Sequence, residues 1–297
     1  MKKTFLTILP IILAPSISLA CACGCGVFDV GTAAMLPTGK GGEIFTEYDF
    51  MDQNQNWHGT SKASADDNDD KRIRSSFITT GFQYMFNSDW GIRTEIPYVG
   101  RRVVTDSDDN VHSSIGDIRI RGIYSGFSPD MSTGITYGLK LPTGDYTYKG
   151  FDRDTNIGSG STNLLLGAYH VGGLTTDRSW NWFINGQLDE PTLTHSGYRP
   201  GSEINTAIGT YYDELYIGNV KVTPIAQAIG STRWHDSGIN SDPDNSGYNR
   251  VLISPGLETN IGNIKLYGDV ELPVYQNVKG NQLVAPELFK LIVSYSF

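Results

Sequence analysis

Apolar and polar residues alternate with a period of two along several long stretches of the chain. In 289–297, the residues Phe289, Leu291, Val293, Tyr295 and Phe297 alternate with Lys290, Ser294 and Ser296. The same pattern recurs in 77–86, 115–124 and 264–272. Such alternation is typical of β-strands with one apolar and one polar face, whereas helices repeat about every 3.6 residues. Because no long stretch after Ala20 shows the helical period, the sequence predicts an all-β fold.

The predicted strands are long, at about 9–13 residues, whereas strands of soluble proteins usually have about 5–6. A tilted strand that crosses a membrane needs about 9–11 residues. Their length therefore favours a transmembrane antiparallel up-and-down β-barrel over a soluble β-sandwich. We predict about twelve strands, near 43–51, 72–86, 91–105, 115–127, 132–142, 160–172, 180–190, 202–213, 219–233, 248–260, 264–276 and 285–297.

The connections between these strands alternate in length. Outer-membrane barrels have short periplasmic turns and longer external loops, and an even number of strands places both barrel ends on the periplasmic side. Aromatic residues such as Trp90, Tyr98 and Trp180 lie near the predicted strand ends, where interfacial girdles form. Short turns are expected near 87–90, 128–131, 175–179, 213–219 and 260–263, and long acidic loops near 52–71, 106–114, 143–160, 191–201, 234–247 and 277–284.

The first twenty residues have the features of a cleaved signal peptide. Two lysines precede an apolar run at 5–14, and the small residues Ser18 and Ala20 stand before Cys21. The apolar run is shorter than the ~20 residues of a transmembrane helix. We therefore expect a signal peptide at 1–20, a Cys- and Gly-rich segment at 21–42 that hangs in the periplasm or plugs the lumen, and the barrel at 43–297.

Composition and charge agree with a barrel in the outer membrane. Hydrophobic residues make up 39% of the 297 residues, too few for a helical membrane protein, and the net charge of −9 argues against a nucleic-acid partner. The 34 glycines, 16 tyrosines and short acidic runs suit an apolar outer belt around a polar lumen. The expected partners are membrane lipid, lipopolysaccharide, a small solute and the barrel-assembly machinery, whose recognition signal the terminal Phe297 resembles.

Two stretches resemble the outer-membrane transporter-like family of the phenol-degradation meta-pathway protein type. The stretch 80–100 carries its Tyr, Trp and Pro-Tyr hairpin pattern, and 138–145 ends on its Lys-x-Pro-Thr-Gly-Asp pattern. Ser114 stands where the family has the first Gly of a Gly-x-Gly-Asp strand opening. The resemblance covers most of the chain after Glu43. It implies the barrel fold and the passage of aromatic or other hydrophobic compounds.

The strand faces opposite the apolar rows are expected to line the lumen. A barrel of about eight strands is filled by side chains, whereas one of 16–18 strands leaves an aqueous channel. For about twelve strands, two interpretations stay open: a narrow polar pore, or a closed lumen held by charge pairs. The charged residues expected there are Arg93, Glu95, Asp117, Arg119, Arg121, Lys140, Glu203, Arg250, Glu258, Asp269 and Glu271.

The three cysteines of the chain form a Cys-x-Cys-x-Cys triplet at Cys21, Cys23 and Cys25. Crowded thiolates bind soft ions such as Cu(I) or Zn²⁺. In the oxidising periplasm the triplet is also compatible with a disulfide that leaves one thiol over. Lipid modification of Cys21 is a third interpretation, although Ser18 stands where such signals usually carry Leu.

Acidic runs and histidines fall in the predicted long loops. The runs at 66–70, 106–109 and 242–245 are candidates for Ca²⁺ or for divalent bridges to lipopolysaccharide, or they are simply solvated. No EF-hand fits, because the twelfth position counted from Asp242 is Ile253. The loop histidines are a candidate external metal site or are solvated: His58, His112, His195 and His235.

These patterns predict a porin-like outer-membrane transporter or channel for small molecules, without a cofactor. A metal-handling barrel that uses the cysteine triplet is the first alternative. A barrel enzyme is the second, although the sequence contains no nucleophile elbow, phosphate loop or His-Glu-x-x-His motif. We name no catalytic residues.

Overall fold

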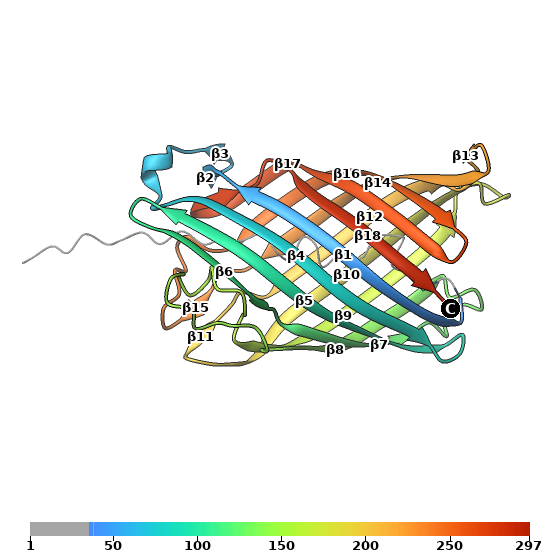
Figure 1. Cartoon of the computed structure of the whole chain (residues 1–297), viewed down its shortest axis with the longest axis horizontal. Helices are drawn as coiled ribbons and strands as arrows, with labels where there is room; N and C mark the ends of the chain where they lie inside the picture. Colours follow the sequence, from blue (N-terminus) through green and yellow to red (C-terminus); the bar gives the residue numbers. More distant parts are fainter. Residues whose placement is uncertain (1–35, 38) are drawn as a thin grey trace, which may run out of the picture.

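The alternating strands pair into one closed antiparallel sheet (Figure 1). The computed structural model describes Leu36, Pro37 and residues 39–297. The twelve barrel strands are β1 (Gly41–Gln53), β4 (Asp70–Met85), β5 (Trp90–Thr105), β7 (Ile118–Tyr124), β8 (Thr133–Leu141), β9 (Ser161–Gly173), β10 (Trp180–Thr194), β12 (Glu203–Tyr212), β14 (Val220–Arg233), β16 (Tyr248–Ile261), β17 (Ile264–Val284) and β18 (Leu288–Ser296). The predicted fold class and strand number are confirmed.

Strands β1 and β18 close the barrel. Glu43 lies opposite Ser296, and Met51 lies opposite Leu288. Beyond these pairs, the backbones of Gly42 and Phe297 exchange two hydrogen bonds of 2.9 Å each. Closure leaves no free barrel edge for another chain to pair with. We call the end where β1 begins and β18 finishes the short-turn end, and the opposite end, which carries β2, β3, β6, β11 and β15, the loop end (Figure 1).

The period-two pattern of the sequence becomes an outer and an inner face. In β18, the outward side chains from Phe289 to Tyr295 are 41–51% exposed. The inward side chains Lys290, Ile292 and Ser294 are only 2–3% exposed. Successive strand side chains point to opposite faces, so each barrel strand supplies both an outer surface and a lumen lining.

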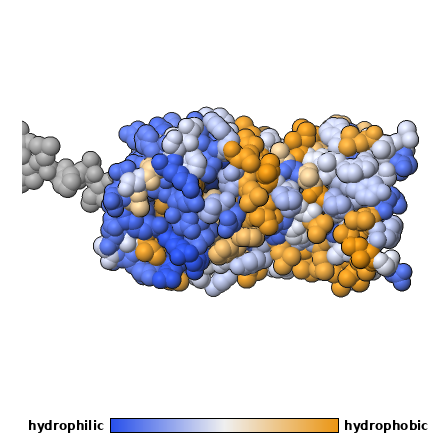
Figure 2. Space-filling model, turned by 90° about the horizontal axis from the view of Figure 1, so that it is seen from above, coloured by the Kyte–Doolittle hydropathy of each residue, from blue (hydrophilic) through white to orange (hydrophobic). Residues whose placement is uncertain are grey.

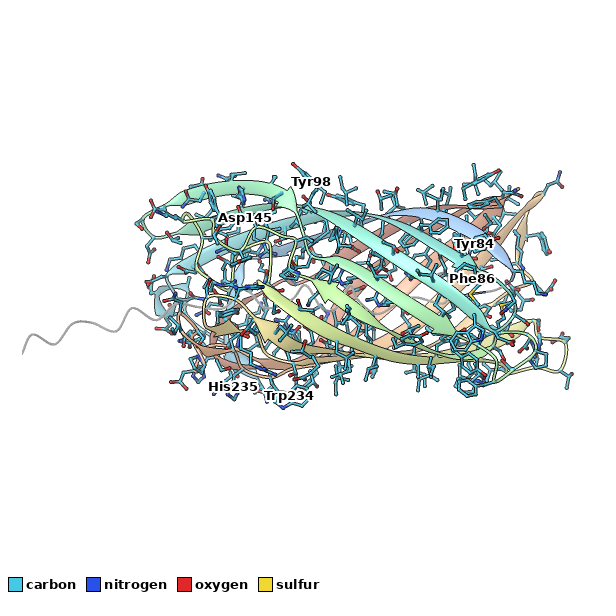
Figure 3. All side chains as sticks on the ribbon, turned by 90° about the horizontal axis from the view of Figure 1, so that it is seen from below. Tyr84, Phe86, Tyr98, Asp145, Trp234 and His235 are labelled. Carbon is cyan, nitrogen blue, oxygen red and sulfur yellow. The ribbon has the colours of Figure 1, made fainter. Side chains whose placement is uncertain are left out.

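The outer face carries an apolar belt. Figure 2 shows apolar residues gathered over the middle and the short-turn part of the barrel, while the loop end is hydrophilic. Aromatic side chains border the belt, with Tyr84 and Phe86 toward the short-turn end and Tyr98 and Trp234 toward the loop end (Figure 3). An exposed apolar surface between aromatic rows is the surface of a barrel in lipid. The protein is therefore a transmembrane barrel of the outer membrane.

Helices are nearly absent from the described part of the chain. There, no helix is long and apolar enough to cross a membrane. A 3₁₀ turn at Ala65–Asp67 follows the hairpin of β2 (Gln55–Gly59) and β3 (Ser61–Lys62). The hairpin lies at the loop end, where β2 pairs with the last part of β17.

Several predicted loops are in fact continuations of the sheet. The predicted loop at 106–114 contains β6 (Asp109–Ile115), which pairs with β5, and the predicted loop at 277–284 belongs to the long strand β17. These parts of the prediction are wrong because the hairpins extend past the apolar belt, where the outer face no longer needs apolar side chains. Three short strands complete the structure: β11 (Tyr198–Arg199) pairs with β15 (Ser237–Gly238), and β13 (Tyr216–Ile217) pairs with β14.

A break between β6 and β7 sets the position of one site residue. Both strands pair with β5, and Gly116 and Asp117 separate them. The Gly116 amide donates to the Pro97 carbonyl at 2.8 Å. Pro97 has no amide proton to donate to a neighbouring strand, and a strand tolerates proline where the pairing is interrupted, as it is here. The break leaves Asp117 buried at the inner wall.

Candidate functional site

The barrel encloses a cavity of about 270 Å³, here called the lumen cavity. Leu36 and Tyr169 line it toward the short-turn end, and Pro200 and Arg233 line it toward the loop end. The alternation of the strands explains its chemistry, because the polar face of each strand points inward. The cavity therefore lies between the two halves of the barrel, and its lining combines charged side chains with apolar ones.

Most of the charged residues predicted for the lumen lie on this cavity. Those in its lining are Arg93, Glu95, Asp117, Arg119, Arg121, Lys140 and Glu203. Arg250, Asp269 and Glu271 are buried but do not line it, and Glu258 is half-buried nearer the short-turn end. Their role in passage of a solute stays a prediction.

Basic side chains gather on one side of the lumen, which we call the cation-rich wall. It consists of Arg93 on β5, Arg119 and Arg121 on β7 and Lys140 on β8, together with the carboxylate Glu95 on β5. Glu95 lies opposite Arg119, and Arg119 lies opposite Lys140. Arg93 Nε donates to Glu95 Oε1 at 2.8 Å, and Arg121 forms a second ion pair with Glu95. This group therefore contains four cations and one carboxylate, and two of the cations, Arg93 and Arg121, pair with that carboxylate.

Lys140 and Arg121 also reach the neighbouring strand β10. Lys140 forms an ion pair with Asp189, and Arg121 Nη2 donates to Gln187 Oε1 at 3.1 Å. Arg93 stacks over the Phe45 ring, with its guanidinium carbon 4.5 Å from the ring centroid. These contacts fix the long basic side chains along the wall instead of leaving them to fill the lumen.

Carboxyl groups gather on another side of the barrel interior, which we call the carboxyl-rich wall. It consists of Glu47 and Asp49 on β1 and Asp269 and Glu271 on β17, together with the ammonium group of Lys290 on β18. Lys290 Nζ lies 3.5 Å from Glu47 Oε1 and 3.7 Å from Asp49 Oδ1. Asp269 Oδ2 accepts hydrogen bonds from Tyr267, Ser254 and Gln227. The carboxyl-rich wall thus contains one ammonium group and four carboxyl groups. On the cation-rich wall, in contrast, positive groups outnumber carboxylates.

The loop at 142–160 folds into the barrel mouth. Asp117 holds both of its ends, because its carboxylate accepts from the Gly144 amide at 3.0 Å and from the Ser159 amide at 2.9 Å and hydroxyl at 2.5 Å. Arg101 holds its middle, because Nη1 donates to the Thr155 carbonyl at 2.6 Å. Its residues 153–159, except for Thr155, line the lumen cavity, so this loop narrows the path at the loop end.

Charged groups of the loop meet a second cluster on the barrel mouth. The Arg153 guanidinium lies over the Tyr198 ring at 4.2 Å, and the Tyr198 hydroxyl donates to Asp236 at 2.6 Å. Burial, with Asp236 and Asp152 close by, raises the pKa of Asp154 to about 7. Burial also raises the pKa of Asp152. The docked loop therefore holds one carboxyl group, that of Asp154, whose pKa is about 7, and a second, that of Asp152, whose pKa is raised.

The short-turn end of the cavity is apolar. Leu36 packs against a buried cluster of Met85, Ile123, Met131 and Tyr169. Leu36 and Pro37 both line the cavity, which favours the luminal over the periplasmic placement for the end of the expected segment 21–42. The expected signal peptide and the triplet of Cys21, Cys23 and Cys25 lie outside the described residues, so both stay predictions.

The acidic runs and loop histidines have other partners. Asp106 pairs with Lys71 at 3.1 Å, and His112 Nε2 lies 2.9 Å from Asp145 Oδ2. His195 stacks near Tyr146 at the barrel mouth. Over residues 36, 37 and 39–297, no three His, Cys, Asp or Glu side chains are grouped to hold a metal ion. In this part of the chain there is therefore no set of ligands for Ca²⁺ at the acidic runs or for a metal ion at the loop histidines.

Several residues of the site were not predicted from the sequence. Glu47 and Asp49 alternate with the outward Thr46 and Tyr48, so the period-two pattern contains a signal for them. Arg153 and Asp154 lie in a loop without periodicity, and only the folding of that loop into the mouth makes them part of the lining.

Comparisons with known proteins show the fold. No protein-family model and no curated protein matches the chain. The crystal structure of an outer-membrane channel from Pseudomonas putida F1 matches with a TM-score of 0.68 at 14% identity, over 90% of this chain and 100% of that one. The beta domain of the Bordetella autotransporter BrkA matches with a TM-score of 0.56 at 13% identity, over 87% of this chain and 100% of that one. The chain is thus similar in fold to outer-membrane barrels of two kinds, and its own lumen must indicate the function.

Proposed function

We propose that the protein is a passive outer-membrane channel for small water-soluble solutes, and not an enzyme. The lumen cavity carries this proposal, because its lining extends from Arg233 near the loop end, past a charged middle part, to the apolar Leu36 and Tyr169 near the short-turn end. Burying charges is costly unless they are paired or hydrated. A path for hydrated solutes accounts for their presence, since polar groups that line a pore replace part of the hydration of what passes.

The lining favours hydrophilic solutes. The family resemblance implies aromatic or hydrophobic compounds, whereas the lining presents Arg119, Lys140 and Asp189 to the cavity. An apolar solute would displace water from these groups without replacing its hydrogen bonds. Water-soluble molecules are therefore the proposed cargo, and an aromatic hydrocarbon is the comparison solute.

The inward loop sets the size limit in this proposal. Asp117, between β6 and β7, and Arg101, on the neighbouring strand β5, tie the loop at 142–160 to one side of the mouth. Phe151 of the same loop is also buried in an apolar cluster with Ile73, Val103 and Leu283, so we infer that the loop stays docked and holds back larger solutes.

Reconstitution tests the proposed function directly. Purified protein in a planar lipid bilayer should give single-channel current steps in potassium chloride, and proteoliposomes should take up arabinose faster than protein-free vesicles. Heat-denatured protein is the control. If native protein gives neither current steps nor arabinose uptake, the channel proposal is wrong. If the protein accelerates toluene uptake over that of protein-free vesicles more than it accelerates arabinose uptake, the substrate class returns to the one that the family resemblance implies.

A further inference from the structure

Two unlike walls border the lumen cavity. Glu47 and Asp49 of the carboxyl-rich wall line it together with Arg119 and Arg121 of the cation-rich wall. We propose that the cavity is a binding site for small zwitterions, molecules with one carboxylate and one ammonium group such as amino acids. This proposal rests on the channel function proposed above and names its substrate class.

The cation-rich wall offers donors for a carboxylate. Arg121 is 6% exposed, and its Nε has no hydrogen-bond partner among the described residues. The Gln187 side chain accepts from Arg121, while its own Nε2 has no partner within the same part of the chain. Both residues line the cavity. Both atoms are almost inaccessible in the structure. Donors that stay desolvated and unpaired cost about 1–3 kcal/mol each, so a ligand carboxylate that draws the two side chains toward the cavity is favoured.

The carboxyl-rich wall offers acceptors for an ammonium. Glu47 is 6% exposed and Asp49 is 2% exposed, and both line the cavity. Glu47 Oε2 and Asp49 Oδ1 accept no hydrogen bond over the described ranges. The nearest cation to Asp49 Oδ1, Lys290 Nζ, stands 3.7 Å away and faces Glu47 as well. A ligand ammonium has three donors, which suits this excess of acceptors.

The barrel places the two walls at an angle to each other. Strand β4 and then β5 separate β1, with Glu47 and Asp49, from β7, with Arg119 and Arg121. Three steps around a closed sheet of twelve strands make a quarter turn. The side chains of both walls therefore project toward a shared corner of the lumen rather than along one strand surface.

The chemistry of the corner separates classes of solute. A carboxylate alone satisfies the arginine side but meets carboxyl groups on the other side, and an ammonium alone has the opposite mismatch. A neutral solute forms no charge-assisted hydrogen bond, which is the stronger kind. Only a zwitterion pairs with both walls. The volume of about 270 Å³ lies just below the ~300–1,000 Å³ of pockets for drug-sized ligands, so an amino acid fits.

Four probes of nearly equal size test the proposal at mildly acidic pH: alanine (zwitterion), lactate (anion), alaninamide (cation) and lactamide (neutral). Each is added to the native channel while the potassium chloride current is recorded. We expect alanine to block the current at a concentration about tenfold below that of the other three, which corresponds to about 1.4 kcal/mol. Conduction of potassium chloride with equal block by all four probes overturns the zwitterion site and leaves the channel standing. Absence of any current overturns both.

Variants test which charged group of the ligand each wall binds. Glu47→Gln with Asp49→Asn should abolish the preference for alanine over lactate, and Arg121→Gln should abolish the preference over alaninamide. Gln187→Met removes a donor without changing charge, so it tests the same wall if Arg121→Gln fails to fold. Arg178→Gln is the matched control, because Arg178 is exposed in a turn at the short-turn end. An unchanged alanine preference in the folded wall variants contradicts the proposal.

Discussion

Gly42 and Phe297 join the two ends of the barrel through two backbone hydrogen bonds, and the Phe297 ring covers the Gly42 backbone. A Cβ atom at Gly42 would lie 2.3 Å from the Phe297 ring. The terminal aromatic ring therefore occupies the space that a larger residue in β1 would need. An aromatic side chain across from a glycine is a recognised way to cover an exposed part of a strand pair.

We predict that Gly42→Val destabilises barrel closure by about 1–3 kcal/mol, because the valine forces the ring away from its place. Denaturant unfolding of the refolded protein, followed on unboiled gels, measures the change. In the background of Phe297→Ala the same substitution should cost clearly less. Equal costs in the two backgrounds would show that the ring and Gly42 are not coupled.

Asp117→Ala should loosen the inward loop. The change removes acceptors for the Gly144 amide and for the Ser159 amide and hydroxyl. Hydrogen bonds to a charged group contribute about 1.5–3 kcal/mol, so we expect at least about a tenfold rise in the ratio of high- to low-conductance states. Single-channel recording measures it, with Asp130→Ala at the opposite end as the control. An unchanged ratio would mean that the loop does not limit the current.

Conductance should depend on pH through Asp154. When the loop is docked, the pKa of Asp154 is about 7, whereas the ordinary value is 3.8. The docked state therefore holds its proton between about pH 4 and pH 7, and docking weakens as the pH rises through that range. Asp152 acts in the same direction, while Arg233 opposes it. The open-state current should rise from pH 4 to pH 7 and level off above pH 8.

The variant Asp154→Asn checks this assignment. It keeps the size of the side chain and removes the titrating group, so the rise of current between pH 4 and pH 7 should become shallower. A variant with the same pH profile as the native channel would assign the response to another group.

Asp236 organises the loop-end cluster. It is 1% exposed, pairs with Arg233 at 2.5 Å and accepts from the Gly201 amide at 2.7 Å. Breaking a buried ion pair by removing one partner costs about 3–5 kcal/mol. We expect Asp236→Ala to make chymotrypsin cleavage after Tyr198, whose hydroxyl donates to Asp236, much faster while the barrel keeps its shifted mobility on unboiled gels. Asp244→Ala is the control, because the Asp244 side chain is 93% exposed on the same loop.

The cysteine triplet has a separate test. If Cys21, Cys23 and Cys25 bind a soft metal, purified native protein should retain zinc after gel filtration, and the triple Cys→Ser variant should lose it. Equal metal content and equal transport in the two proteins would remove the metal-handling alternative.

The strands were predictable because lipid and water impose opposite demands on their two faces. The outward row from Phe289 to Phe297 and the inward Lys290 follow from period two alone, as do the inward positions of Arg119 and Arg121. The same logic failed at β6 and at the end of β17, since these parts extend beyond the belt and no longer need an apolar outer face.

The site was predictable only where it lies on strands. Alternation indicates that Glu95 and Lys140 face inward, yet it says nothing of which charges pair across neighbouring strands. Arg153 and Asp154 became part of the site because Asp117 and Arg101 hold their loop in the mouth. Contacts between residues so far apart in sequence depend on the register and closure of the whole barrel, which no local pattern encodes.

Because Leu36 contacts Met85 and Tyr169, the chain enters its first strand, β1, from inside the barrel. Changes in the length or charge of the residues just before β1 should then alter throughput rather than insertion into lipid. Leu36 and Pro37 thus border the proposed solute path, and a reporter group attached at Pro37 would sense what passes.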